Sequence, residues 1–207
     1  MSKQSAFNIS LLGESTVGKT CIFNVYEEKK DFKIESVVAT IGVDTNIKKV
    51  KFPGDDKEYK FRIFDTAGQE RYKSFSNTTL QIADGLLMVF AVDNRESFEK
   101  INEWFANISE HIDLKEKIIF IVGNKIDLEE RQVKKEEGEE LAKNLGFKYR
   151  ETSAKTGEGT KEVFQEIFKD IYEGYKKQNH NNNEERFKLN RKKHSKNKFS
   201  KFFKKIC

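Results

Sequence analysis

The sequence predicts an α/β fold: a single domain built on a mostly parallel sheet of six strands, one of them antiparallel, with helices on both faces. Apolar runs that resemble buried strands alternate with helical segments over the first 175 residues, a pattern typical of parallel sheets covered by helices. A glycine-rich loop directly follows the first run, as in a strand–loop–helix unit. A sharp change of composition after residue 175 predicts a separate, disordered basic tail at 176–207.

Local signals support each element in turn. The turn Pro53-Gly54-Asp55-Asp56 separates two short arms and predicts a hairpin, which supplies the antiparallel pair. Ser97 is placed to cap a helix, and Gly146 to end another. We expect strands near residues 6–12, 45–52, 57–64, 86–92, 117–122 and 147–152, and helices near 18–29, 97–111, 133–145 and 159–175.

A phosphate-binding loop is predicted at residues 13–20, where the sequence matches G-x-x-x-x-G-K-[ST] after a strand. The glycines let the backbone turn tightly, so that successive amide groups point toward a phosphate. Lys19 would reach the outer phosphates, and the Thr20 hydroxyl would bind magnesium. We expect the loop and its successor to contact the nucleotide through Gly13, Ser15, Thr16, Val17, Gly18, Lys19, Thr20 and Cys21.

The identity of the base is indicated by Asn124-Lys125-Ile126-Asp127, which follows a second apolar run. The Asp127 carboxylate would accept hydrogen bonds from N1–H and the exocyclic amine of guanine, a donor pair that adenine lacks. A third loop follows the last strand, where the Ala154 amide would reach the guanine carbonyl. The expected base contacts are Asn124, Lys125, Asp127, Ser153, Ala154 and Lys155.

The segment Asp65-Thr66-Ala67-Gly68-Gln69-Glu70 lies between these motifs, at another strand end. Asp65 is expected to act as a magnesium carboxylate, either on the ion or one hydrogen bond from it. The Gly68 amide would approach a γ-phosphate, and Gln69 would orient water for in-line attack. The three motifs in this order predict hydrolysis of GTP.

With these motifs the chain resembles the Ras superfamily of small GTPases, and within it the Rab family, over residues 6 to about 175. Thr40-Ile41-Gly42-Val43-Asp44 is similar to the first switch segment of Rab proteins. The resemblance implies GTP or GDP as substrate and bound nucleotide, and Mg²⁺ held by Thr20, Thr40 and Asp65. It implies slow hydrolysis through Gln69, Lys19 and Thr40, with Phe32 packed on the guanine.

The resemblance also implies partners. These are an exchange factor, a GTPase-activating protein, effectors, GDP dissociation inhibitor and the prenylation machinery, all acting on a monomer. Three family positions that form an aromatic effector patch differ here: Thr45 and Thr79 replace large side chains, and Phe64 replaces Trp. We therefore expect weak binding to the effectors of ordinary Rab proteins.

The tail carries 12 Lys or Arg against two Glu, a net charge of +10, so the +5 of the whole chain leaves −5 on residues 1–175. Lysines interleave with apolar side chains toward Cys207, which favours a membrane surface over a nucleic acid. The resemblance implies a prenyl group on Cys207. Basic residues near an anionic leaflet add about 1 kcal/mol each to such an anchor. We expect cycling between the cytosol and the cytosolic face of intracellular membranes.

Three other functional classes remain open at this point. A Ras-like signalling GTPase of the plasma membrane is supported by the single terminal cysteine. A constitutively GTP-bound scaffold is disfavoured by the retention of Gln69. A nuclear or RNA-associated GTPase would use the basic tail for nucleic acid. The leading hypothesis is a GTP/GDP switch that controls vesicle and membrane traffic.

Overall fold

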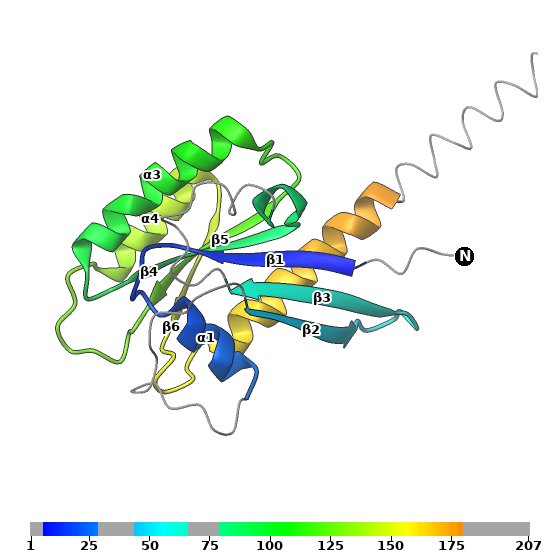
Figure 1. Cartoon of the computed structure of the whole chain (residues 1–207), viewed down its shortest axis with the longest axis horizontal. Helices are drawn as coiled ribbons and strands as arrows, with labels where there is room; N and C mark the ends of the chain where they lie inside the picture. The colour runs from blue at the N-terminus through cyan, green and yellow to red at the C-terminus, as the bar shows by residue number, and fades with distance from the viewer. Residues whose placement is uncertain (1–5, 29–43, 66–78, 180–207) are drawn as a thin grey trace, which may run out of the picture. The chain divides into compact units, whose positions relative to one another are not determined.

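The computed structural model describes residues 6–28, 44–65 and 79–179 (Figure 1). Its strands are β1 (Ala6–Leu12), β2 (Asp44–Lys51), β3 (Glu58–Asp65), β4 (Gly85–Ala91), β5 (Ile118–Asn124) and β6 (Lys148–Thr152). Its helices include α1 (Lys19–Tyr26), α3 (Arg95–His111) and α4 (Lys135–Leu145), and residues 79–82 and 160–179 are also helical.

The six strands form one sheet in the order β2-β3-β1-β4-β5-β6. β2 pairs antiparallel with β3, and every other neighbouring pair is parallel. The predicted fold class is thereby confirmed, including the hairpin as the source of the single antiparallel strand. The strand order runs outward from β1 in both directions, and in such sheets ligands bind beyond the carboxyl ends of the strands.

The chain divides into two compact units, residues 1–169 and 170–207, and the account below concerns the first. In the second unit, residues 170–179 are helical, and Asn179 Nδ2 donates to the Tyr175 carbonyl at 2.9 Å. The boundary that the sequence suggests at residue 175 stays a prediction. Residues 180–207, with Cys207, lie outside the described part of the chain.

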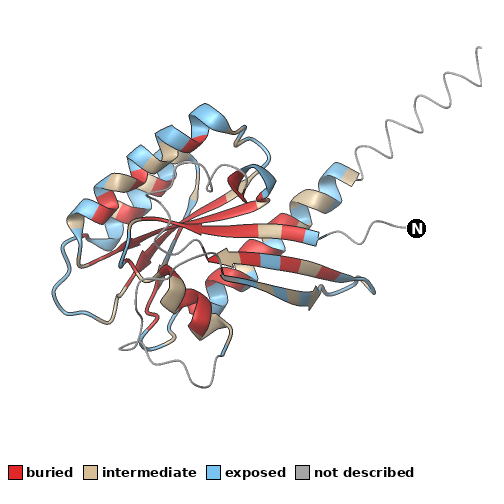
Figure 2. Ribbon diagram, in the orientation of Figure 1, coloured by how far each residue is buried: buried red, intermediate tan, exposed pale blue. Residues whose placement is uncertain are grey.

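Burial explains why the strands have the sequences they have (Figure 2). Every residue of β4 is buried, as expected for a central strand with helices on both faces. β3 instead alternates between buried and more exposed residues, which is the period of a strand covered on one side. The hairpin of β2 and β3 therefore has one side facing the core and one side facing solvent.

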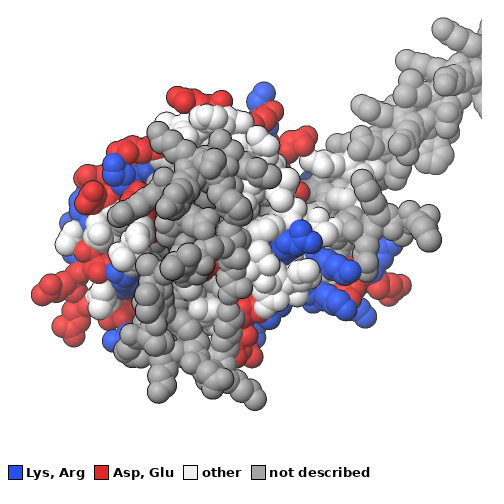
Figure 3. Space-filling model, viewed as in Figure 1, with Lys and Arg blue, Asp and Glu red and all other residues white. Residues whose placement is uncertain are grey.

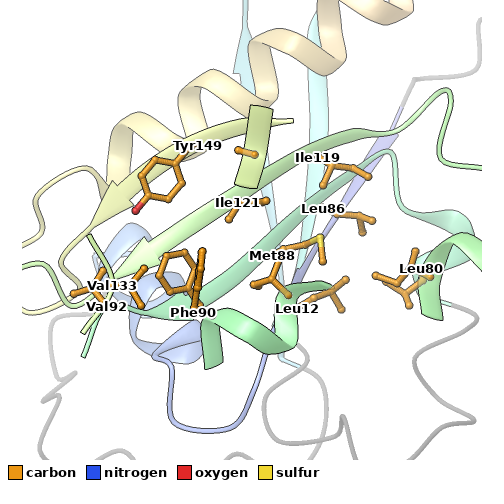
Figure 4. Close-up of a cluster of buried hydrophobic side chains, with 14 of the residues drawn as sticks. Leu12, Leu80, Leu86, Met88, Phe90, Val92, Ile119, Ile121, Val133 and Tyr149 are labelled. Atoms are coloured by element: carbon orange, nitrogen blue, oxygen red, sulfur yellow. The ribbon is translucent and has the colours of Figure 1, made fainter. Parts of the chain in front are cut away.

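Two apolar layers hold the helices to the sheet. On one face, a cluster joins β4 and β5 to α3 and α4, with Phe90 and Ile121 fully buried at its centre (Figure 4). On the other face, Tyr26 of α1 stacks on Phe164 at 4.1 Å, and Phe61 of β3 stacks on Phe168 at 4.4 Å. These aromatic pairs fix α1 and the helix beginning at residue 160 against the hairpin.

The helix ends correct one prediction and confirm another. α3 begins at Arg95 because Asn94 caps it, with Asn94 Oδ1 accepting from the Ser97 amide at 3.0 Å. The prediction that Ser97 caps this helix was therefore wrong. Its hydroxyl donates to the Asn94 carbonyl at 2.7 Å from inside the first turn. Gly146 ends α4 as expected, with φ of 77°, a conformation that favours glycine.

Candidate functional site

The loops with sequence motifs meet at one edge of the sheet. β1, β3, β5 and β6 run in the same direction, so the segments that follow them lie beyond the same edge (Figure 1). These segments are the glycine loop after β1, residues 124–127 at the end of β5, and residues 153–155 after β6. Asp65 ends β3 at this edge and is fully buried.

The backbone of the glycine loop leaves no room for side chains at its two glycines. Gly13 has φ of 136°, and a Cβ there would lie 2.0 Å from the Val89 carbonyl oxygen. Gly18 has φ of 96°, and a Cβ there would lie 2.3 Å from Asn124 Nδ2. Both positions combine a left-handed conformation with a close approach, which only glycine tolerates.

Lys19 lies inside this loop and is 4% exposed. Its Nζ donates to the Gly13 carbonyl at 2.6 Å and to the Glu14 carbonyl at 2.8 Å. A buried ammonium group needs such partners, because its desolvation is otherwise costly. The loop thus holds one positive charge on its inner side, where a phosphate would be placed.

The side chain of Asn124 joins three loops and is 1% exposed. Its Nδ2 donates to the Val17 carbonyl of the glycine loop at 2.8 Å. Its Oδ1 accepts from Thr152 Oγ1 at 3.1 Å and from the Ala154 amide at 3.2 Å. The sequence suggested that Asn124 and the Ala154 amide contact the base; in the structure they bond to each other and lock the loops together.

The Asp127 carboxylate is held by its neighbours and is only 11% exposed as a side chain. Ser153 Oγ donates to Asp127 Oδ1 at 2.6 Å, and Lys155 Nζ lies 3.9 Å from Asp127 Oδ2. The Thr156 amide donates to Ser153 Oγ at 3.0 Å and orients that hydroxyl. A carboxylate fixed in this way can accept two parallel N–H donors without first paying to become ordered.

Two contacts at this edge escaped the sequence analysis. Lys125 has φ of 68°, and its Nζ lies 3.2 Å from Asp93 Oδ2, just beyond β4. The position of Asp93, a carboxylate just after β4, is a sequence signal that could have indicated its contact with Lys125. Trp104 of α3 donates from Nε1 to Glu14 Oε1 at 3.3 Å, across 90 residues of sequence, and nothing in the sequence indicates that pair.

The residues predicted to hold magnesium fit that ion in chemistry. Mg²⁺ takes oxygen ligands and is usually bound by one or two protein groups together with substrate phosphates. Thr20 lies in the first turn of α1, and the Asp65 carboxylate is buried at the same edge of the sheet. Within the described residues no group of three or more His, Cys, Asp or Glu could hold a metal by itself.

Cys21 follows Thr20 and is half-buried. Burial raises the pKa of its thiol, and the nearby negative charge of Asp65 raises it further. The thiol is therefore neutral at physiological pH, which suits a packing role beside the loop better than a reactive one.

Other predicted residues fall outside the described ranges: Phe32, Thr40, Gly68, Gln69 and Cys207. A cavity of about 280 Å³ lies elsewhere in the fold, lined by residues of α1, β2 and the 157–161 segment. Of the described helices, none is both long and apolar enough to span a bilayer.

Comparison with known proteins adds independent support. The sequence model of the Ras family matches residues 8–173. The chain is similar to Ras-related protein Rab-8B of Homo sapiens, with 39% identity over 166 residues that cover 80% of this chain and 78% of the relative. It is also similar to Ras-related protein Rab-8 of Diplobatis ommata, 40% identical over 80% of this chain and 77% of the relative. Rab-8A of Bos taurus is 39% identical over 80% and 78% of the two chains.

Proposed function

The chain belongs to the Rab family of Ras-superfamily GTPases, and we propose that the loops at the carboxyl edge of the sheet are its guanine-nucleotide site. As a member of that family it binds GTP and GDP, hydrolyses GTP to GDP and phosphate, and regulates vesicle trafficking through regulators and effectors. The Rab relatives favour this function over Ras-like signalling.

The glycine loop supplies the phosphate contacts in this proposal. Its backbone amides and the Lys19 ammonium together offer positive potential to the β- and γ-phosphates. Lys19 would exchange its carbonyl partners at 2.6 and 2.8 Å for phosphate oxygens of higher charge. Mg²⁺, held by Thr20, Asp65 and Thr40, would neutralise phosphate charge when bound.

Guanine selectivity is carried by the fixed Asp127 carboxylate. Because Ser153 and Lys155 hold it at 2.6 and 3.9 Å, the carboxylate is oriented and mostly screened from water. Adenine would leave it without donors, which is costly for a desolvated charge. This arrangement is the main observation behind the proposed site. Ala154 would turn its amide from Asn124 Oδ1 to the base carbonyl as the nucleotide enters.

Replacement of Asp127 tests the base assignment. Asp127→Asn should shift preference from guanine to xanthine nucleotides, since the amide donates where xanthine has a carbonyl. Asp56→Asn, an exposed carboxylate in the hairpin turn, serves as the matched control and should keep guanine preference. Competition with GDP, XDP and ADP measures the effect. Equal affinity of the unmodified protein for ATP and GTP would overturn the assignment.

Hydrolysis in this proposal relies on positioning and electrostatics. Gln69 orients the attacking water against Thr40, and an arginine from a GTPase-activating protein adds roughly 10³–10⁵-fold. Gln69→Leu should therefore trap the GTP form. Single-turnover hydrolysis, with and without an activating extract, is the measurement; an unchanged rate in the variant would remove Gln69 from the reaction.

Membrane attachment in this proposal depends on Cys207 and the basic tail. A prenyl group alone anchors weakly, and the lysines around it add attraction to an anionic leaflet. Delivery and retrieval would use the prenylation machinery and GDP dissociation inhibitor. Cys207→Ser should release the protein to the cytosol, and neutral replacements at Lys198, Lys201, Lys204 and Lys205 should make attachment more sensitive to salt. A Cys207→Ser protein that stays on membranes would identify another anchor.

A further inference from the structure

The outward side of the β2–β3 hairpin carries an unusual set of side chains. Residues opposite each other in an antiparallel ladder share one side of the sheet. Ile47 pairs with Arg62, Lys49 with Lys60, and Lys51 with Glu58. The alternate residues of β3, including Phe61, are buried toward Phe168. We call the opposite, outward set the hairpin face: Ile47, Lys49, Lys51, Lys60 and Arg62.

The hairpin face combines an exposed aliphatic residue with several positive charges (Figure 3). Ile47 is 49% exposed, and the Lys49 side chain is 60% exposed. On the same side of the hairpin lies one carboxylate, Glu58, which pairs with Lys51 across the ladder and whose oxygen lies 3.7 Å from Lys49 Nζ. Figure 3 shows Lys and Arg side chains gathered over β2 and β3. The face is therefore strongly basic, with the apolar Ile47 at the end that adjoins Thr45 and Phe64.

A second exposed isoleucine borders the hairpin face. In the parallel register of β1 and β3, Arg62 lies beside Asn8, and Asn8 Nδ2 donates to the Ile82 carbonyl at 3.1 Å. Ile82 is 48% exposed. The described part of the chain exposes three large hydrophobic residues. Ile47 on β2 and Ile82 in the helical turn 79–82 lie on either side of Arg62, and Leu128 lies elsewhere.

The hairpin face lies away from the nucleotide edge. Asp65 marks that edge on β3, and Arg62 and Lys60 precede it by three and five residues, or roughly 10 and 17 Å at about 3.3 Å per residue. The β2–β3 ladder is continuous from Asp44–Asp65 to Lys51–Glu58. The basic pairs of the hairpin face are therefore set back along the ladder from the strand ends that carry the phosphate loop.

We propose that the hairpin face binds an acidic protein segment with aliphatic or aromatic anchors, in both nucleotide states. Desolvated apolar side chains supply most of the affinity at protein interfaces, and Ile47 and Ile82 are the exposed apolar anchors here. Charge complementarity supplies orientation and association rate. An acidic segment complements the cations next to Ile47. Such a partner also accounts for the change along this side of the hairpin, from the aromatic-patch positions Thr45 and Phe64 to the basic residues beyond them.

A protein segment fits this face better than an anionic bilayer. Proteins that insert into a membrane surface usually present a broad apolar face with Trp, Phe or Leu. Here the two isoleucines are separated by Arg62 and Asn8, and the carboxylate of Glu58 lies beside Lys51 on the same side of the hairpin. A bilayer would repel that carboxylate, whereas a folded or extended partner can place a lysine or arginine opposite it.

Peptide selection on the full-length protein tests the proposal. The protein, loaded with GDP or with a non-hydrolysable GTP analogue, is used to select binders from a random peptide display library. We expect binders rich in Asp and Glu with Leu, Ile or Phe, with equal affinity in both nucleotide states. Lys60→Glu combined with Arg62→Glu should weaken these peptides about tenfold or more, and Ile47→Ser should weaken them as well.

Matched controls separate this proposal from the others. Lys135→Glu with Lys143→Glu reverses two exposed charges on α4 and should leave peptide affinity unchanged. Every variant should retain bound guanine nucleotide and its thermal midpoint, so that failure of the nucleotide site is recognised independently. Neutral or basic binders, binding in one nucleotide state alone, or full affinity in the Lys60/Arg62 variant would overturn the proposal. Loss of that variant from phosphatidylserine-containing vesicles, with no peptides selected, would assign the face to lipid.

Discussion

Replacing Asn124 with alanine should destabilise the protein more than any single hydrogen bond at this edge can account for. The substitution removes bonds of 2.8, 3.1 and 3.2 Å that reach Val17, Thr152 and Ala154. Each buried group left without a partner costs about 1–3 kcal/mol. Thr152 can rotate its hydroxyl to another acceptor, so we expect a total loss of about 3–5 kcal/mol. That is a large part of the stability of a typical domain.

Urea unfolding at fixed GDP and magnesium concentrations measures this loss, because bound ligand also contributes to stability. Thr152→Val is the control: it removes one of the three bonds and should cost about 1 kcal/mol. GDP should also dissociate faster from the Asn124 variant, since the glycine loop loses its tie to β5. If Asn124→Ala lowers the free energy of unfolding no more than Thr152→Val does, the bonds of Asn124 to the loops do not contribute to stability.

Three further predictions concern a helix glycine, an ion pair and a buried tyrosine. Gly138→Ala should lower the midpoint of urea unfolding, because the added Cβ would lie 2.4 Å from Tyr149 Cζ. This clash should outweigh the roughly 1 kcal/mol by which alanine favours a helix over glycine. A higher midpoint would refute the packing argument. Asp93→Asn should speed GDP release about twofold to fivefold, as expected for a partly exposed pair, and should have no added effect once Lys125 is alanine. Burial, and then the charge of Glu27, raise the pKa of Tyr26 to about 12. The stability that neutral Tyr26 contributes should be complete below pH 10 and disappear as the pH rises through about 12. In the Tyr26→Phe variant the free energy of unfolding should not show this decrease.

The phosphate loop could be predicted from sequence because its chemistry is local. Gly13, Gly18 and Lys19 occupy fixed places in one short segment, and the backbone there has the positive φ values that glycine permits. The hairpin was predictable for the same reason, since Pro53 and Gly54 define the turn. Strand ends were found to within a residue or two.

Contacts between distant segments could not be predicted in this way. Asn94 and Ser97 have the same capping chemistry, and only the backbone geometry decides between them. The contact of Asn124 with the base stays a prediction, and its bonds to Val17, Thr152 and Ala154 had no sequence signal. Thr79 is expected to remove a large apolar contact from the effector patch, and its burial, at 7% exposed, could not be predicted from sequence. Thr45 is exposed, so Thr45→Phe alone is the substitution that tests for a lost effector contact.

The bond between Trp104 and Glu14 gives the protein a built-in optical probe. Trp104 is the single tryptophan of the chain, so all indole emission comes from one half-buried position on α3. Its Nε1 lies 3.3 Å from Glu14, the second residue of the phosphate loop. Indole emission responds to the charge and hydration around that nitrogen. Movement of the loop would therefore change the wavelength and the intensity of the Trp104 emission. We expect nucleotide exchange on unlabelled protein to change the Trp104 emission, and Glu14→Gln to reduce that change.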